Sequence, residues 1–436
     1  MAWYVIVSFF MLVVLLVIGL PVALVFLATT LFLVVAGGYS IDYLLPYSYN
    51  MLNSVTFIAF TMFIIAGGVI ERGGVGEHLV NFVNMLFGRI KGGLGIVMTV
   101  TCGVFGAISG SAFAAETVVG AIMLPRMKEA GYPEELSGSL LASCSMLGCF
   151  IPPSGTMIFY AWLTGNSVLA CFLSTLLPGI ILMIMFSVWF CYKCRKVPTI
   201  QVAPKLPPNE RRAYAKKTTW TSLPALIFPV IVLGGIYSGI MTTSEAAAVS
   251  ILYALIVGIF VYKKIKVNNV GGVFAKAGIS AGVCTLMVFT VSMLSRIYVV
   301  EGLGDTLTAL INSFTSSKVV VILLVDLFMV FLGLLMDDCS ALMLCGPIML
   351  QVVQSVGVDP IQFACMLAVN FGMGCVTPPA APLLYMSSRL SKVSVGKMMP
   401  STFSIILCIW LPMILLVSFV PDLSLWLPRV ILGYGA

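Results

Sequence analysis

The feature that most constrains this chain is a series of apolar runs, each long enough to cross a lipid bilayer. A transmembrane helix needs about 20 consecutive apolar residues. Runs of this kind lie at 3–35, 54–70, 171–192, 219–239, 244–262, 275–299 and 400–420. Of the 436 residues, 60% are hydrophobic and 9% are charged, whereas ordinary soluble domains carry about 25% charged residues. We therefore expect an all-α polytopic membrane protein, in which Pro21 either kinks the first run or divides it into two segments.

The basic residues predict the orientation of the chain in the bilayer. The loop at 193–217 holds eight Lys and Arg residues and a single acid, whereas the loop at 36–53 holds no Lys or Arg. Basic loops remain on the cytoplasmic side of a membrane. We expect 193–217 to be cytoplasmic and 36–53 to face outward. Because the cations that give the net charge of +7 lie in such short loops, we expect lipid and not nucleic acid as the partner.

Two further apolar stretches, 94–125 and 318–347, are interrupted near their middles. The interrupting residues are small or polar: Ser109, Gly110 and Ser111, with Glu116 beyond them, and then Gly333, Asp337 and Asp338. Each stretch has roughly 30 residues, too few for two full crossings at about 1.5 Å per residue. We expect two re-entrant hairpins of half-length helices. Non-helical backbone at that depth requires surrounding protein or a water-filled cavity.

An internal repeat relates the segments that follow these stretches. Gly120–Pro153 and Gly346–Pro379 align without a gap, with 11 of 34 positions identical, and both end in Gly-Cys-x-x-Pro-Pro. The first copy begins beside Arg126, and the second is followed by Arg389. If both cations are cytoplasmic, the copies cross the membrane in opposite directions. This is the arrangement of inverted-repeat secondary transporters.

The Pro-Pro pairs have a direct effect on the backbone. Proline has no N–H, so a helix that reaches such a pair loses the hydrogen bonds to the carbonyls four residues earlier. This predicts free carbonyls at Gly148, Cys149, Gly374 and Cys375. A free carbonyl within a bilayer is costly unless something binds it, and broken helices of transporters bind Na⁺ in this way. The alternative is a plain proline kink, with the carbonyls bonded to nearby Ser or Thr hydroxyls.

Two acids in apolar segments are candidates for coupling. An ionisable residue within a membrane segment indicates function by default, so Asp337 is expected to couple to an ion or substrate. Its alternative role is an N-cap for the second hairpin helix. Glu116 is a second candidate, and its alternative is an ion pair with Arg126 or with another cation at the edge of the domain. His78 is the only histidine, and the lack of positioned partners for it argues against an enzyme.

Several strings together resemble one family of membrane proteins. They are SGSAFAAETVVGAIMLPRMKEAGYP, GCFIPPSGTMIFY, MTTSEAAAVSILYALIVG, GLLMDDCSALMLCGPIML and NFGMGCVTPPAAPLLYMSS. In this order they resemble the large membrane subunit of tripartite ATP-independent periplasmic (TRAP) transporters over nearly the whole chain. The resemblance implies an inverted-repeat elevator transporter like those of the ion transporter superfamily, with two re-entrant hairpins and two broken helices, in the bacterial inner membrane.

The resemblance also implies a function and partners. It implies Na⁺-coupled import of a small organic anion, a carboxylate or sulfonate, which a periplasmic substrate-binding protein delivers. A small four-helix membrane subunit is expected on a separate chain. The alternative is a stand-alone Na⁺/organic-anion symporter of related architecture.

By the same resemblance, at least two Na⁺ sites are expected. Their ligands are Ser109, Gly148, Ile151 and Pro152 in the first site, and Gly333, Gly374, Thr377 and Ala380 in the second. Substrate-binding or coupling roles are expected for Ser111, Ser154, Asp337 and Glu116.

The chain is expected to divide into a scaffold and a moving transport domain. The scaffold comprises 1–93, 166–317 and 389–436, with interfacial arms at 71–93 and 301–316. The transport domain comprises repeat 1 at 94–165 and repeat 2 at 318–388.

Overall fold

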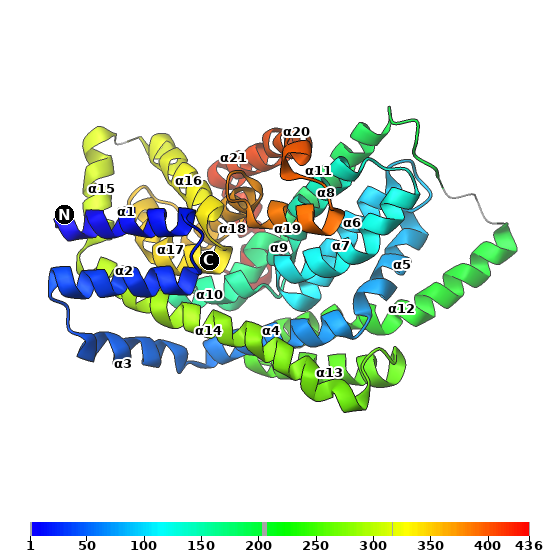
Figure 1. Cartoon of the computed structure of the whole chain (residues 1–436), viewed down its shortest axis with the longest axis horizontal. Helices are drawn as coiled ribbons and strands as arrows, with labels where there is room; N and C mark the ends of the chain where they lie inside the picture. Colours follow the sequence, from blue (N-terminus) through cyan, green and yellow to red (C-terminus); the bar gives the residue numbers. More distant parts are fainter. Residues whose placement is uncertain (1, 203–206, 316, 436) are drawn as a thin grey trace.

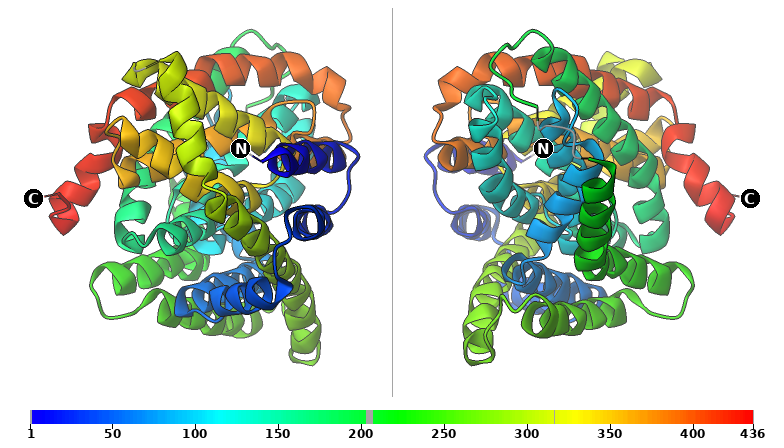
Figure 2. Two further views of the ribbon diagram at one scale, coloured as in Figure 1. Left: turned by 90° about the vertical axis from the view of Figure 1, so that its left-hand side faces the viewer. Right: turned by 90° about the vertical axis from the view of Figure 1, so that its right-hand side faces the viewer.

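The computed structural model describes residues 2–202, 207–315 and 317–435. In these ranges the regular structure is helical, with 22 α-helices and three short π or 3₁₀ turns. Figure 1 shows α4, α12, α13 and α14 along one side of the molecule, with the helices of both repeats on the other. Figure 2 shows the same molecule from its two ends. The all-α class expected from the sequence is confirmed.

Six of the seven predicted spans are helices long and apolar enough to cross a membrane. They are α4 (Val55–Arg72), α11 (Val168–Cys194), α12 (Pro208–Tyr237), α13 (Thr243–Ile256) with the π turn that follows it, α14 (Val270–Val300), and α20 (Val395–Ile405) joined through a second π turn to α21 (Leu411–Phe419). A seventh helix of this kind is α16 (Lys318–Leu335), which the sequence assigned to the second hairpin.

The first apolar run forms two short helices. They are α1 (Trp3–Val17) and α2 (Val22–Gly37), which pack side by side. Between them Gly19 adopts a positive φ of 87°, which glycine accepts without steric cost, and Pro21 is the N-cap of α2. Of the two readings of Pro21, division into separate segments is therefore the one observed.

Both interrupted stretches form two helices joined by a tight break. The first pair is α6 (Gly93–Ser109) and α7 (Ala112–Glu129), and the second is α16 and α17 (Asp338–Ser355). These helices have 17 or 18 residues, about 26 Å at 1.5 Å per residue. The expectation of half-length helices is wrong for α16, which is long and apolar enough to cross a membrane. Helices α7 and α17 also run past the predicted ends of the hairpins, because Pro125 and Pro347 lie inside them and do not end them.

Each Pro-Pro pair interrupts a helix. In repeat 1, α8 (Glu134–Ser145) and α9 (Leu147–Phe150) end before Pro152, and α10 (Gly155–Thr164) begins after it at a bend of 46°. In repeat 2, α18 (Pro360–Val376) ends before Pro378, and α19 (Pro382–Ser391) begins after it. The predicted broken helices are therefore present in both repeats.

The remaining helices connect these units. The two amphipathic segments form α5 (Val75–Phe87) and α15 (Leu303–Phe314). The segment expected as an outer loop contains α3 (Ile41–Leu52), and the chain finishes with α22 (Asp422–Leu432).

In both repeats, glycines bring the first hairpin helix against the broken helix, backbone to backbone. A Cβ at Gly106 of α6 would overlap the Cα of Gly148 in α9. A Cβ at Gly374 of α18 would lie 2.6 Å from the carbonyl carbon of Gly333 in α16. Only glycine permits such contacts, since each facing atom belongs to the backbone. The contacts fix each hairpin directly beside the break in its own repeat.

We predict that Gly106→Ala lowers the thermal unfolding temperature of the purified protein. The added methyl group would have to move the Gly148 backbone, and overpacking of this kind costs about 1–3 kcal/mol. The matched control is Gly278→Ala in α14, where a Cβ meets nothing within 4 Å. Equal unfolding temperatures for the two variants would show that the backbone contact is not tight.

Candidate functional site

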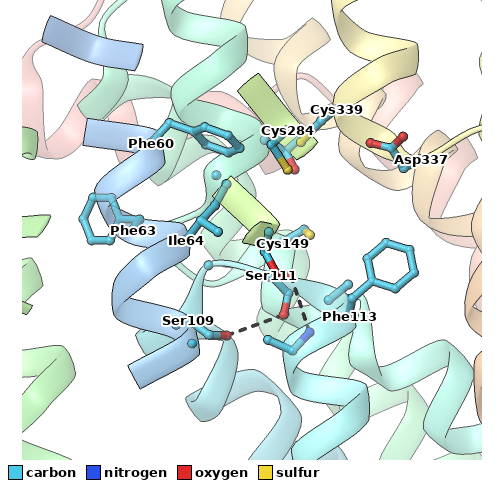
Figure 3. Close-up of a pocket in the computed structure, with 18 of the residues that line it drawn as sticks. Phe60, Phe63, Ile64, Ser109, Ser111, Phe113, Cys149, Cys284, Asp337 and Cys339 are labelled. Atoms are coloured by element: carbon cyan, nitrogen blue, oxygen red, sulfur yellow. Dashed lines mark hydrogen bonds between the residues drawn. The ribbon is translucent and has the colours of Figure 1, made fainter. Parts of the chain in front are cut away.

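A cavity of about 450 Å³ lies between the hairpin tips and the helices α4 and α14. Both repeats contribute to it. Hairpin one contributes residues 109–114 and Thr117, and the broken helix of repeat 1 contributes Cys149, Gly155 and Thr156. Hairpin two contributes residues 337–339. Figure 3 shows Ser111 and Phe113 on one side of the cavity, Asp337 and Cys339 on another, and Phe60 and Phe63 of α4 closing it.

The tip of hairpin one is docked onto the broken helix of its own repeat. Gly110 ends α6 with a φ of 63°, and Ser111 caps α7 by accepting the Ala114 N–H at 3.4 Å. Ser109 Oγ donates to the Ser111 carbonyl at 3.5 Å. The Gly155 N–H donates to the Gly110 carbonyl at 3.2 Å. The tip is therefore bonded to the first residue of α10.

Residues predicted to form the first Na⁺ site come close at this tip. A Cβ at Gly148 would lie 2.9 Å from the Ser111 carbonyl oxygen, so Gly148 lies beside Ser111. Pro152 cannot donate to the Gly148 carbonyl, and the Ile151 N–H donates to Leu147 instead, at 3.0 Å. Among the described residues, no side chain and no N–H from outside the helix donates to the Gly148 carbonyl. Its predicted release is supported.

Fewer of the residues predicted for the second Na⁺ site come close to one another. Gly333 and Gly374 are in backbone contact, but the Thr377 N–H donates to the Gly374 carbonyl at 3.0 Å. The expectation that Gly374 has a released carbonyl is wrong, because a tighter i→i+3 turn supplies the donor that Pro378 lacks. Thr377 Oγ1 donates to the Met373 carbonyl at 2.6 Å, and Ala380 is exposed.

Asp337 is both an N-cap and a cavity residue. Its carboxylate accepts the backbone N–H of Ser340 at 3.1 Å and the Ser340 hydroxyl at 2.5 Å. The capping alternative is therefore observed. Since Asp337 also lines the cavity, the coupling role stays a prediction.

Asp338 connects the two repeats. Its carboxylate accepts a hydrogen bond from Thr156 Oγ1 of α10 and the Cys149 thiol of α9, the latter at 3.6 Å. Both partners belong to repeat 1, whereas Asp338 belongs to hairpin two. The adjacent acids thus have different tasks, since Asp337 caps its own helix and Asp338 reaches across the cavity.

The remaining predicted residues lie apart from the cavity. Ser154 is buried as the N-cap of α10 and accepts the Met157 N–H at 3.5 Å. Glu116 is fully buried on α7, and neither carboxylate oxygen has a hydrogen-bond partner in the described chain. The proposed ion pair of Glu116 with Arg126 is wrong, because Arg126 donates to Asn81 Oδ1 at 2.9 Å.

Sequence reasoning missed several residues that line the cavity. These are chiefly the aromatic and hydroxyl side chains Phe60, Phe63, Phe113, Thr156 and Ser280. The three phenylalanines lie in apolar stretches, where nothing distinguishes them from lipid-facing or core residues. Thr156 follows the first Pro-Pro pair, so its proximity to the break was the one available signal.

Hairpins and broken helices around a partly enclosed cavity are typical of membrane transporters, and solved structures share the fold. The YdaH transporter of Alcanivorax borkumensis superposes with a TM-score of 0.59 at 15% identity, over 89% of this chain and 88% of that one. MtrF of Neisseria gonorrhoeae, from a class of antimetabolite efflux pumps, gives a TM-score of 0.56 at 11% identity, over 86% and 83%.

The family is established by sequence. The model of the tripartite ATP-independent periplasmic transporter DctM component matches residues 9–423. The chain belongs to this family of large permease subunits and is a multi-pass protein of the inner membrane.

Several curated relatives carry transport names. The sialic acid TRAP transporter large permease SiaM of Vibrio cholerae is 30% identical over 96% of both chains. The C4-dicarboxylate permease DctM of Pseudomonas aeruginosa is 28% identical over 86% of each. The isethionate permease DctMQ of Oleidesulfovibrio alaskensis is 30% identical over 94% of this chain, which spans 64% of that longer protein.

We predict that Asp337→Asn retains the fold but loses transport. Asparagine caps a helix about as well as aspartate, so the substitution removes only the charge at the cavity. We expect uptake to fall about tenfold or more, because removing about 1.4 kcal/mol of coupling energy already changes a rate tenfold.

Uptake by cells that express the complete transporter would measure this effect. The matched control is Asp359→Asn, which alters the N-cap of α18 outside the cavity and should preserve uptake. Normal uptake by Asp337→Asn would show that Asp337 caps α17 and has no role in coupling.

Proposed function

We propose that this chain is the large transport subunit of a TRAP importer that carries an organic acid into the cell in symport with Na⁺. The family match over residues 9–423 supports the transport role. The names of its relatives, which transport sialic acid, C4-dicarboxylates and isethionate, support an organic acid as the substrate. The structural observation that supports Na⁺ coupling is the Gly148 carbonyl near the tip of hairpin one, which accepts no hydrogen bond from the described residues outside its helix.

The partners follow from the tripartite family. A periplasmic substrate-binding protein would deliver the organic acid, and a small four-helix membrane subunit on a separate chain would enlarge the scaffold. Many apolar side chains of the scaffold helices are exposed, among them Val35, Ile279 and Phe260. Such residues suit contact with lipid or with a partner subunit.

The transport step would be an elevator movement of the two hairpins and the two broken helices. The glycine contacts of Gly106 with Gly148 and of Gly333 with Gly374 hold each hairpin to its break, so these elements would move as one body. The cavity lies where this body meets α4 and α14. A body that carries a charged ligand through lipid must shield the charge, and Na⁺ at the hairpin tips would do so by bringing positive charge to the acid.

The packing extends this moving body beyond the predicted repeats. Helix α11 packs against α6, α18 and α22, while α20 packs against α8 and α21 against α18. The predicted division assigned α11, α20 and α21 to the scaffold. We include α11 and α21 in the moving body, because separating them from α18 would expose a helix that is buried along nearly its whole length. We include α20 because it packs against α8.

We predict that proteoliposomes containing this chain and its small subunit take up substrate only with an inward Na⁺ gradient and the binding protein. Uptake should stop when the Na⁺ gradient is removed while an equal K⁺ gradient is kept. Uptake without Na⁺ would exclude the role assigned to Gly148, and uptake without the binding protein would favour the stand-alone symporter.

A further inference from the structure

A smaller cavity, of about 180 Å³, lies where the scaffold meets hairpin two. Helices α1, α14 and α15 form its scaffold side, and α16 and α17 form the side of the moving body. Figure 1 shows α1, α15 and α17 together at one end of the molecule. We call this cavity the apolar groove, and its lining includes Ile6 and Phe9 of α1, Tyr298 of α14, Leu307 of α15, Phe328 of α16 and Ile348 of α17.

The groove is closed on one side by an aromatic pair that joins the two bodies. The rings of Phe9 and Phe328 stack with their centroids 6.3 Å apart and their planes at 23°. Phe9 belongs to the scaffold, and Phe328 belongs to hairpin two. Any molecule in the groove therefore contacts both the scaffold and the moving body.

The lining of the groove selects hydrocarbon over water and over an organic acid. None of its described lining residues is charged, and the only hydroxyl among them, that of Tyr298, shares a hydrogen bond of 3.1 Å with the Ser8 hydroxyl. An apolar cavity of about 150 Å³ stays dry and binds a hydrocarbon that is offered to it. A charged acid would lose its hydration in the groove without gaining a polar partner.

The groove is continuous with the surface that faces the lipid. At its edge, the side chain of Ile6 is 55% exposed. The helices that form the groove carry further exposed apolar side chains outside it, on α1, α15 and α16: Val7, Leu310 and Leu327. Exposed apolar surface of this kind in a membrane protein contacts the bilayer. An acyl chain can therefore enter the groove from the side without passing through water.

The volume of the groove excludes a helix of a partner subunit. A helix is about 10 Å wide and rises about 5.4 Å per turn, so even one turn takes up more than twice the volume of the groove. A single acyl chain is far thinner, and its methylene groups can contact both walls. Such contacts replace those that the lining of an empty cavity lacks.

We propose that the apolar groove binds one acyl chain of a membrane phospholipid. The chain lies between α1, α14 and α15 on one side and hairpin two on the other. This inference goes beyond the proposed function, because binding of the chain requires neither Na⁺ nor the organic acid.

The test is photolabelling of the complete transporter in proteoliposomes. The bilayer consists of phosphatidylethanolamine and phosphatidylglycerol, with a small share of phosphatidylcholine that carries a diazirine on one acyl chain. Mass spectrometry locates the labelled residues. The diagnostic residues are Cys345, Ile348 and Met349 of α17, which line the groove and are at most 4% exposed. Because lipid that only coats the surface does not reach them, we expect their labelling to report a chain inside the groove.

A matched pair of variants on α1 tests the entrance. Ile6→Trp places a larger side chain at the edge of the groove, and we expect labelling of α17 to fall about tenfold. Val7→Trp adds the same side chain at the neighbouring residue, which is 41% exposed and lies outside the groove. We expect it to label like the unmodified protein. Both residues are exposed, so neither substitution crowds the core.

A second pair tests the groove from α15. Leu307→Trp fills part of the groove and should also reduce labelling of α17, whereas Leu310→Trp, outside the groove and 51% exposed, should not. Ile279 of α14 is 67% exposed and lies outside the groove, so its labelling is the internal reference in every sample.

Two results overturn the proposal. The first is labelling of Ile279 without labelling of the diagnostic residues in the unmodified protein, which is also the result expected if a side chain of the small subunit fills the groove. The second is equal labelling of α17 in Ile6→Trp and Val7→Trp together with equal labelling in Leu307→Trp and Leu310→Trp.

Failure of this inference is distinguishable from failure of the proposed function. Labelling is measured without substrate and without a Na⁺ gradient, so it reports the lipid alone. An unlabelled groove in a protein with Na⁺-dependent uptake would remove the acyl chain and retain the importer. A labelled groove in a protein whose uptake does not depend on Na⁺ would do the reverse.

Discussion

The hydrogen bond that Pro152 cannot donate is the constraint on which the site depends. Its loss ends α9 at Phe150 and starts a new helix at Gly155. The same break leaves the Gly148 carbonyl without a donor and directs the N-terminus of α10 at the cavity. Because Gly106 and Gly148 have no side chains, α6 approaches α9 closely, and the Ser111 carbonyl oxygen lies 2.9 Å from the Cβ position of Gly148. The missing N–H of Pro152 and the missing side chains of Gly106 and Gly148 thus bring the tip of hairpin one close to the break and to the N-terminus of α10.

The two repeats share this design but not all of its details. Both have a glycine contact between hairpin and broken helix, and both break at a Pro-Pro pair. In repeat 2, however, Thr377 donates to the Gly374 carbonyl, so that oxygen has one acceptor position filled. Of the acids that line the cavity, Asp337 and Asp338 belong to hairpin two and none belongs to hairpin one. The carboxylates that the two repeats contribute to the cavity therefore come from repeat 2 alone, and Asp338 accepts hydrogen bonds from Thr156 and Cys149 of repeat 1.

Much of the fold could be predicted, because a long apolar run or a proline determines the structure of its own segment of the chain. The positions of α4, α11 and α14 follow from composition alone, and the breaks follow from Pro152 and Pro378. The continuation of α7 past Pro125 and of α17 past Pro347 was not predictable, since a proline inside a helix is tolerated when neighbouring helices support it. Within the site, Ser109 and Gly148 could be predicted from the repeat and the family resemblance. The contact of Asp338 with Thr156 could not, because the two residues are 182 positions apart and meet only through packing.

Ion density at the Gly148 carbonyl tests the central claim most directly. A high-resolution structure of the complete membrane complex in saturating NaCl, compared with one in a Na⁺-free buffer, would show whether an ion binds there. The account predicts density that depends on Na⁺, coordinated by the Gly148 carbonyl and by oxygens of the Ser109–Ser111 tip. A Gly148 carbonyl that is hydrogen-bonded to a neighbouring hydroxyl in both structures, with no ion beside it, would contradict it.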